Sequence, residues 1–151
     1  MSSTVSVRHA TEADLPFILN ELKSFAVFFN SKISLFPSEE FAYAGMKSHI
    51  TDHVLLVAEN EEGLIGFISG MYHKHIFNPA IECLTETFWW VPEKHRGGRA
   101  GLVLLNEFTR IGKMNAKWIV FTLEHHSPVN ERCLFKRGFV PKEHTYLLEV
   151  A

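Results

Sequence analysis

The chain has 151 residues, 46% hydrophobic and 21% charged, which predicts one globular domain over residues 1–151 with an adequate core. Its formal net charge of −2 excludes the basic composition typical of nucleic-acid binding, so a small molecule or a basic partner fits better. No stretch approaches the roughly 18 apolar residues of a membrane span, and the N-terminus lacks the pattern of a signal peptide. We therefore expect no membrane partner and a cytoplasmic location.

The N-terminal half predicts one strand, two helices and a hairpin. Residues 4–9 alternate apolar and polar side chains, as in a half-buried strand. Thr11 with Asp14 forms a variant capping box before a helix to about residue 29. Ser38, followed by two glutamates, starts a second helix that ends near Thr51. The β-rich runs 54–59 and 64–72 follow, joined by Glu-Glu-Gly as in a hairpin.

The C-terminal half predicts three more strands and two helices. The apolar run 81–91 is typical of a buried central strand, and the apolar face of 101–114 indicates a helix. Residues 117–123 predict another core strand, Ser127-Pro128 opens a helix that ends at Gly138, and Tyr146 to Val150 form a last strand. The order β-α-α-β-β-β-α-β-α-β indicates an α/β (α+β) fold, a mixed sheet flanked by about four helices.

The segment His95-Arg96-Gly97-Gly98-Arg99-Ala100-Gly101 links the central strand to the following helix. Free N–H groups at a helix start attract phosphate, glycines allow close approach, and arginines add charge. The segment is neither a P-loop nor a dinucleotide fingerprint. From the residues alone it is an anion site or an ordinary solvated turn.

With the preceding strand end, Phe88-Trp89-Trp90-Val91-Pro92, this segment resembles the signature of the GNAT N-acetyltransferases, including small phage and prophage members. Val7 to Leu15, Gly63 to Ile68 and Phe135 to Phe139 extend the resemblance over nearly the whole chain. Arg99 departs from it, because glycine is usual at that position. The resemblance implies a mainly antiparallel GNAT-like sheet and acetyl-CoA as co-substrate.

The resemblance also implies a set of cofactor-binding residues. The backbone of Trp89, Trp90 and Val91 would pair with the pantetheine arm of acetyl-CoA. The opposite wall of the gap would include Asn130, with His125, His126 and Ser127 as further candidates. The pyrophosphate would lie on the turn, which contributes Arg96, Gly97, Gly98, Arg99, Ala100 and Gly101.

Acetyl transfer needs a base for the amine and an acid for the departing thiolate. Members of the family often use a glutamate on the central strand, and Glu86 is the candidate, with Glu82 in reserve. On a period of two, Leu84, Glu86, Phe88 and Trp90 share one face. A purely structural Glu86 on a wet part of the sheet, or paired with a basic side chain, is the alternative.

The acid is less evident from the sequence. Many members carry a tyrosine shortly before the final Gly-Phe, where this chain has Leu134 and Phe135. Tyr146, His126 or solvent are the candidates that remain.

Other clusters have simpler interpretations. His49 with His53 and the pair in His73-Lys74-His75 have metal-compatible spacing, but no cysteine or carboxylate group completes a site, so we expect no metal. The two cysteines, Cys83 and Cys133, are expected to be reduced core residues. An aromatic set is expected mainly to pack the helices, with a substrate groove between the first two helices as the alternative: Phe25, Phe28, Phe29, Phe36 and Phe41.

The sequence thus predicts an acetyl-CoA-dependent N-acetyltransferase that moves an acetyl group to a primary amine by direct attack in a ternary complex, without a metal. The amine belongs to a small molecule or a protein, and a homodimer is possible. Two alternatives remain: a CoA-binding or interaction module that keeps the fold without turnover, and a structural protein that does not bind CoA.

Overall fold

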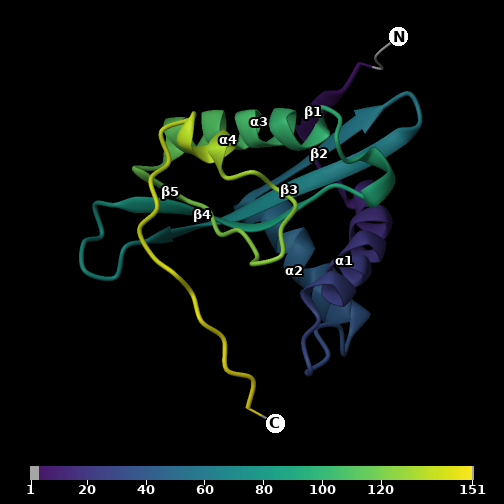
Figure 1. Cartoon of the computed structure of the whole chain (residues 1–151), viewed down its shortest axis with the longest axis horizontal. Helices are drawn as coiled ribbons and strands as arrows, with labels where there is room; N and C mark the ends of the chain where they lie inside the picture. The colour runs from purple at the N-terminus through teal and green to yellow at the C-terminus, as the bar shows by residue number, and fades with distance from the viewer. Residues whose placement is uncertain (1–3, 151) are drawn as a thin grey trace.

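The computed structural model of the chain describes residues 4–150. In these residues the sheet has the strand order β1-β2-β3-β4-β5, and every neighbouring pair is antiparallel except β4 and β5. Helix α3 covers one face, and α1 and α2 cover the other (Figure 1). The strands are β1 (Ser6–His9), β2 (Val54–Asn60), β3 (Gly63–Lys74), β4 (Glu82–Trp90) and β5 (Trp118–Val120). The mixed, mainly antiparallel α/β fold is confirmed.

The first two helical segments begin at the caps that the sequence predicted. A short 3-10 turn, η1 (Glu12–Asp14), leads into α1, and the Thr11 N–H donates to Asp14 Oδ2 at 2.8 Å. Ser38 Oγ accepts the Phe41 N–H at 3.2 Å and caps α2. The remaining bounds are α1 (Leu15–Phe29), α2 (Glu39–Asp52), η2 (Glu93–His95), α3 (Ala100–Asn115) and α4 (Arg132–Phe135).

Two apolar clusters lie on opposite faces of the sheet. The cluster under α3 includes Leu84 and Phe108, and Trp89 packs against it. The cluster under α1 and α2 includes Phe67, and Phe88 and Trp90 pack against it. Strand β4 therefore contributes side chains to both faces.

A bulge in β4 overturns the predicted face of this strand. Phe88 lies opposite Ser69 and Glu86 lies opposite Gly70, so Thr87 is an extra residue in the register. One extra residue reverses the alternation of side chains beyond it. Leu84 consequently faces α3, whereas Phe88 and Trp90 face α1, and the expectation that all of them share one face was wrong.

Strands β4 and β5 separate after a short parallel contact. Only Cys83 to Thr85 pair with β5, which is limited to Trp118–Val120 rather than the predicted 117–123. From Glu86 onward the edge of β4 that faces away from β3 has no strand beside it among the described residues. This open edge is where the cavity described below lies.

The C-terminal elements differ from the prediction. No strand forms over 146–150, and Tyr146 and Leu148 are exposed. The chain end lies beside the α1–α2 loop, because Glu149 accepts hydrogen bonds from the Ser31 hydroxyl and from the Lys32 N–H. It therefore runs away from β5 instead of along it (Figure 1).

The last helix is also shorter than predicted. Ser127 Oγ accepts the Val129 N–H at 3.2 Å and Asn130 Oδ1 accepts the Arg132 N–H at 3.0 Å. These local turns occupy the residues that were expected to begin the helix, because short polar side chains compete for backbone groups. Helix α4 is consequently limited to Arg132–Phe135.

Candidate functional site

The turn between β4 and α3 has the geometry of an anion site. Gly97 adopts a positive φ of 83°, which favours glycine. The N-cap residue of α3, Arg99, makes no side-chain capping bond, and the first turn of α3 holds no acidic residue. The first N–H groups of a helix have no partners within it, and they carry the positive end of the helix dipole. The turn can therefore accept a phosphate group.

The two arginines of the turn have different surroundings. Arg96 Nε donates to the Val91 carbonyl oxygen at 2.8 Å, and its guanidinium centre lies 4.6 Å from the Trp90 ring centroid. Arg96 thus joins the turn to the end of β4. Arg99 is exposed and Ala100 is buried in the cluster under α3, and neither lines the cavity.

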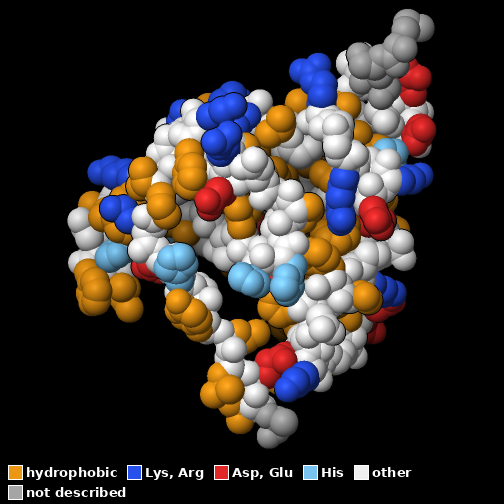
Figure 2. Space-filling model, in the orientation of Figure 1, with side chains coloured by type: hydrophobic (Ala, Val, Ile, Leu, Met, Phe, Trp, Pro, Cys, Tyr) orange, Lys and Arg blue, Asp and Glu red, His pale blue; other side chains and the backbone are white. Residues whose placement is uncertain are grey.

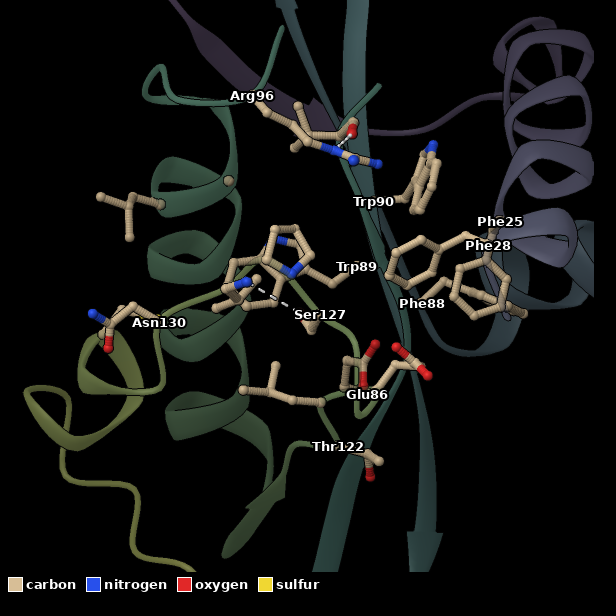
Figure 3. Close-up of a pocket in the computed structure, with 18 of the residues that line it drawn as sticks. Phe25, Phe28, Glu86, Phe88, Trp89, Trp90, Arg96, Thr122, Ser127 and Asn130 are labelled. Carbon is tan, nitrogen blue, oxygen red and sulfur yellow. Dashed lines mark hydrogen bonds between the residues drawn. The ribbon is translucent and has the colours of Figure 1, made fainter. Parts of the chain in front are cut away.

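A cavity of about 880 Å³ lies along the open edge of β4. Its walls come from β4, the turn before α3, the end of α1 and the segment 122–137 (Figure 3). The structure brings together nine of the residues predicted for the site, namely Glu86, Trp89, Trp90, Val91, Arg96, Gly97, Gly98, Gly101 and Asn130.

Glu86 lies inside this cavity, half-buried, between β4 and the segment that holds Thr122 (Figure 3). Burial raises the pKa of its carboxyl group to about 8, and an interaction with the backbone of Thr122 opposes this shift more weakly. A carboxyl group with a pKa near neutrality suits general base chemistry. The reserve candidate, Glu82, is at the start of β4 and does not line the cavity.

The structure does not bring the proposed acids to the cavity. Tyr146 is 89% exposed, and His126 is exposed and outside the lining, like His125. Ser127 and Cys133 do line it, although Cys133 was expected to be an inert core residue. Cys133 is a free, half-buried thiol, whereas Cys83 is buried as expected.

A buried polar network supports the bulge, and sequence reasoning missed it. His49 on α2 shares one hydrogen bond with the Gly45 carbonyl at 2.8 Å and another with Thr87 Oγ1 at 3.1 Å. Thr87 Oγ1 also lies 2.7 Å from Ser69 Oγ. Burial lowers the pKa of His49, so the ring is neutral. A carbonyl can only accept, so Nδ1 carries the proton, Thr87 donates to Nε2 and Ser69 donates to Thr87.

The sequence marked His49 only by its metal-compatible spacing from His53, and nothing in the sequence marks a bulge at Thr87. The phenylalanine set divides among three environments. Phe25, Phe28 and Phe29 of α1 line the cavity, but no described residue of α2 does, so the cavity is not the predicted groove between the first two helices. Phe36 packs under α1 and α2, and Phe41 is 82% exposed.

Over residues 4–150, no three His, Cys, Asp or Glu side chains gather into a potential metal site. None of the helices in this range has the length and apolar character to cross a bilayer.

No protein-family model and no curated protein sequence matches the chain. Solved structures do match it over nearly its whole length. A structure described as a transcriptional regulator from Bacillus halodurans has a TM-score of 0.77 at 20% identity, covering 97% of this chain and 100% of that chain. A predicted acetyltransferase with acetyl-CoA from Clostridium acetobutylicum has a TM-score of 0.74 at 14% identity, covering 97% and 96%.

A third structure, a ribosomal-protein-alanine N-acetyltransferase from Brucella melitensis, has a TM-score of 0.75 at 15% identity, with 98% of this chain and 99% of that chain covered. Two of these three proteins are named as acetyltransferases and one as a regulator. At such identities the similarity establishes the fold, which does not by itself fix the activity.

Proposed function

We propose that this chain, which has the fold of the GNAT acetyltransferases, is an acetyl-CoA-dependent N-acetyltransferase. It would move an acetyl group to a primary amine by direct attack in a ternary complex. The observation that carries this proposal is that one cavity holds both the glycine-rich turn before α3 and a carboxyl group with a raised pKa.

The cavity has what the co-substrate requires. A pyrophosphate fits the turn, because Gly97, Gly98 and Gly101 line the cavity at the start of α3. An extended pantetheine arm fits the open edge of β4, where Trp89, Trp90 and Val91 line the cavity. Acetyl-CoA supplies the acyl group when it is bound.

Glu86 is the proposed base. An alkyl amine is mostly protonated at neutral pH, so it must lose a proton before its nitrogen can attack. The ionised Glu86 carboxylate accepts this proton, and its raised pKa makes it a stronger base than an exposed glutamate. Backbone N–H groups at the open edge of β4 would stabilise the negative charge that develops on the carbonyl oxygen.

The new carbon–nitrogen bond forms as the carbon–sulfur bond breaks. The nitrogen then loses one further proton to water in the cavity, the thiolate gains one from that water, and Glu86 returns its proton to solvent, so the products are an amide, a free thiol and one released proton. We propose that a water molecule in the cavity donates the proton to sulfur, because Tyr146 and His126 lie outside the lining. Ser127 and Asn130 stand on the wall opposite β4 and would orient this end of the co-substrate.

Thiol release from acetyl-CoA tests this function. A panel of primary amines should include a substrate that releases free thiol and yields an acetylated product by mass spectrometry. Glu86→Gln should lower kcat about 100-fold or more, because general base catalysis contributes about that much. Glu82→Gln, on the same strand but outside the cavity, is the matched control and should keep wild-type activity.

The pH profile gives an independent readout. Since Glu86 must be ionised, kcat/KM should rise with pH and level off above about 8, and Glu86→Gln should lose this limb. Saturable binding of acetyl-CoA without product from any amine would refute the proposal in favour of a CoA-binding module. Absence of CoA binding would leave a structural protein.

A further inference from the structure

The cavity has two sides with different chemistry, because the bulge at Thr87 turns the residues after it to new faces. Trp89 packs toward α3, beside the glycines of the turn. Phe88 and Trp90 pack toward α1 and α2. Glu86 lies between the two sides in Figure 3.

The side toward α1 is a continuous aromatic wall, formed by Phe25, Phe28, Phe29, Phe88 and Trp90 and called here the aromatic side. Phe25 meets Phe88 edge to face with ring centroids 5.3 Å apart, and it meets Trp90 in the same way at 5.8 Å. Phe28 lies 5.8 Å from Trp90. Such edge-to-face pairs hold one another in place, so the wall presents fixed rings to the cavity.

The polar atom of these rings, the indole nitrogen of Trp90, already has a hydrogen-bond partner. Trp90 Nε1 donates to Glu21 Oε2 at 2.9 Å, and Arg96 stacks on the Trp90 ring. A ligand on the aromatic side therefore meets ring faces and edges rather than hydrogen-bonding groups. An apolar or aromatic body is favoured there, because burying it removes apolar surface from water.

The charges of the described lining residues limit the ligand further. Two carboxylates are among them, Glu86 and Glu124, and Glu124 Oε2 accepts the backbone N–H of His126 at 2.6 Å. Four cationic side chains line the same cavity, namely Arg96, Arg132, Lys136 and Arg137. A polyamine or an aminoglycoside carries several ammonium groups, and the rings of the aromatic side offer no carboxylate for any ammonium group beyond the one at Glu86.

We propose that the acceptor is a monoamine carried on an aromatic or bulky apolar body. Its amine would lie at Glu86 and its body on the aromatic side, while the phosphates of acetyl-CoA occupy the opposite side. This inference rests on the proposed acetyltransferase function and names the substrate class of that site.

The test compares 2-phenylethylamine, ethylamine, spermidine and kanamycin with acetyl-CoA at saturation. The expected kcat/KM for 2-phenylethylamine exceeds that for ethylamine about tenfold or more, because one buried ring contributes at least that factor to binding. The kcat/KM values for spermidine and kanamycin, each divided by the number of amino groups in the molecule, should be lower than the kcat/KM for ethylamine. If spermidine or kanamycin had a higher kcat/KM than 2-phenylethylamine, the inference would be overturned, and the acetyltransferase function would still stand.

Phe28→Ala is the test variant and Phe41→Ala is its control. Both replace a phenylalanine by alanine, but Phe41 is exposed and lies outside the cavity. Phe28→Ala should raise KM for 2-phenylethylamine about tenfold, and the preference for 2-phenylethylamine over ethylamine in kcat/KM should shrink by a similar factor. Phe28→Leu, which keeps most of the volume, serves if the alanine variant does not fold. An unchanged KM in a folded variant would refute the inference.

Calorimetry separates failure of the inference from failure of the function. If no amine turns over, 2-phenylethylamine should still bind in the presence of CoA, and Phe28→Ala should weaken that binding. That result keeps the aromatic side as a ligand site while the acetyltransferase function fails. Absence of binding by 2-phenylethylamine would reject the inference itself.

Discussion

Glu86 combines two properties that normally exclude each other, because it is an ionisable group and its carboxyl is buried. Burial raises its pKa to about 8, and no salt-bridge partner of Glu86 is found among the described residues. A structural carboxylate usually has a basic partner that lowers its pKa, as Asp14 does in its ion pair with Arg8 at 2.8 Å. The unpaired, raised-pKa state of Glu86 therefore favours a functional role.

This residue should also make stability depend on pH. A carboxyl group whose pKa is higher in the folded state than in the unfolded state favours folding at low pH, and this advantage is lost as pH rises from about 4.5 to about 8. Glu86→Gln removes the titration. We expect the variant and the wild type to differ little near pH 4, and the variant to gain thermal stability relative to the wild type as pH approaches 8.5.

Differential scanning calorimetry at several pH values measures this difference. If the difference in melting temperature between the wild type and Glu86→Gln stayed constant across the pH range, the assigned environment of Glu86 would be contradicted.

At the scale of single elements, the bulge in β4 is the feature that arranges the site. It depends on Thr87, whose hydroxyl connects His49 on α2 with Ser69 on β3. Ser69 is fully buried and His49 nearly so. The network ties a helix to the bulged strand, so its loss should affect the cavity wall as well as the fold.

Thr87→Val keeps the shape of the side chain but removes the hydroxyl. We expect a loss of about 1–3 kcal/mol in unfolding free energy, because two buried polar groups lose a partner. Thr51→Val on α2 is the control, since Thr51 is exposed and its hydroxyl contacts only helix carbonyls. Urea denaturation of both variants provides the comparison, and equal losses would show that the network adds nothing specific.

At the scale of the whole molecule, the C-terminal segment is the least integrated part of the described chain. Its apolar side chains are exposed, with Tyr146 at 89% and Leu148 at 83%. An opening lies between part of the segment and the body of the molecule (Figure 2), and Glu149 joins the chain end to the α1–α2 loop. Strand β5 is at one end of the sheet, and no strand in residues 4–150 pairs with its outer edge. Exposed apolar segments and open strand edges both promote association between molecules.

We therefore expect a chain shortened after His144 to self-associate less than the full chain while melting within about 2 °C of it, because the removed segment is mostly exposed. Light scattering over a range of concentrations, combined with thermal melts, measures both quantities. A loss of many degrees would mean that the segment packs on the sheet in solution.

The sequence predicted the features that leave local signals. Gly97 and its neighbours were identified as a turn before a helix, and the caps at Thr11 and Ser38 were placed correctly, because each depends on residue types at fixed spacing. The roles predicted for the site residues stay predictions.

Other features depend on contacts that no local pattern reveals. The bulge at Thr87 depends on His49 and Ser69, which come from other elements. The run 146–150 alternates like a strand whether or not a neighbouring strand is beside it, so its pattern predicted pairing that the structure does not show. The aromatic side combines the end of α1 with β4, and the reversal of side chains at the bulge decided which rings meet.

The open edge of β4 has a consequence for amide hydrogen exchange. Between Glu86 and Trp90, the backbone N–H groups on the cavity edge of β4 have no strand partner. The N–H groups on the other edge face β3 and are within the sheet. The same short strand should therefore contain both fast-exchanging and slow-exchanging amides. A ligand lying along this edge would slow the first group and leave the second unchanged, so deuterium uptake by this peptide reports directly on occupancy of the site.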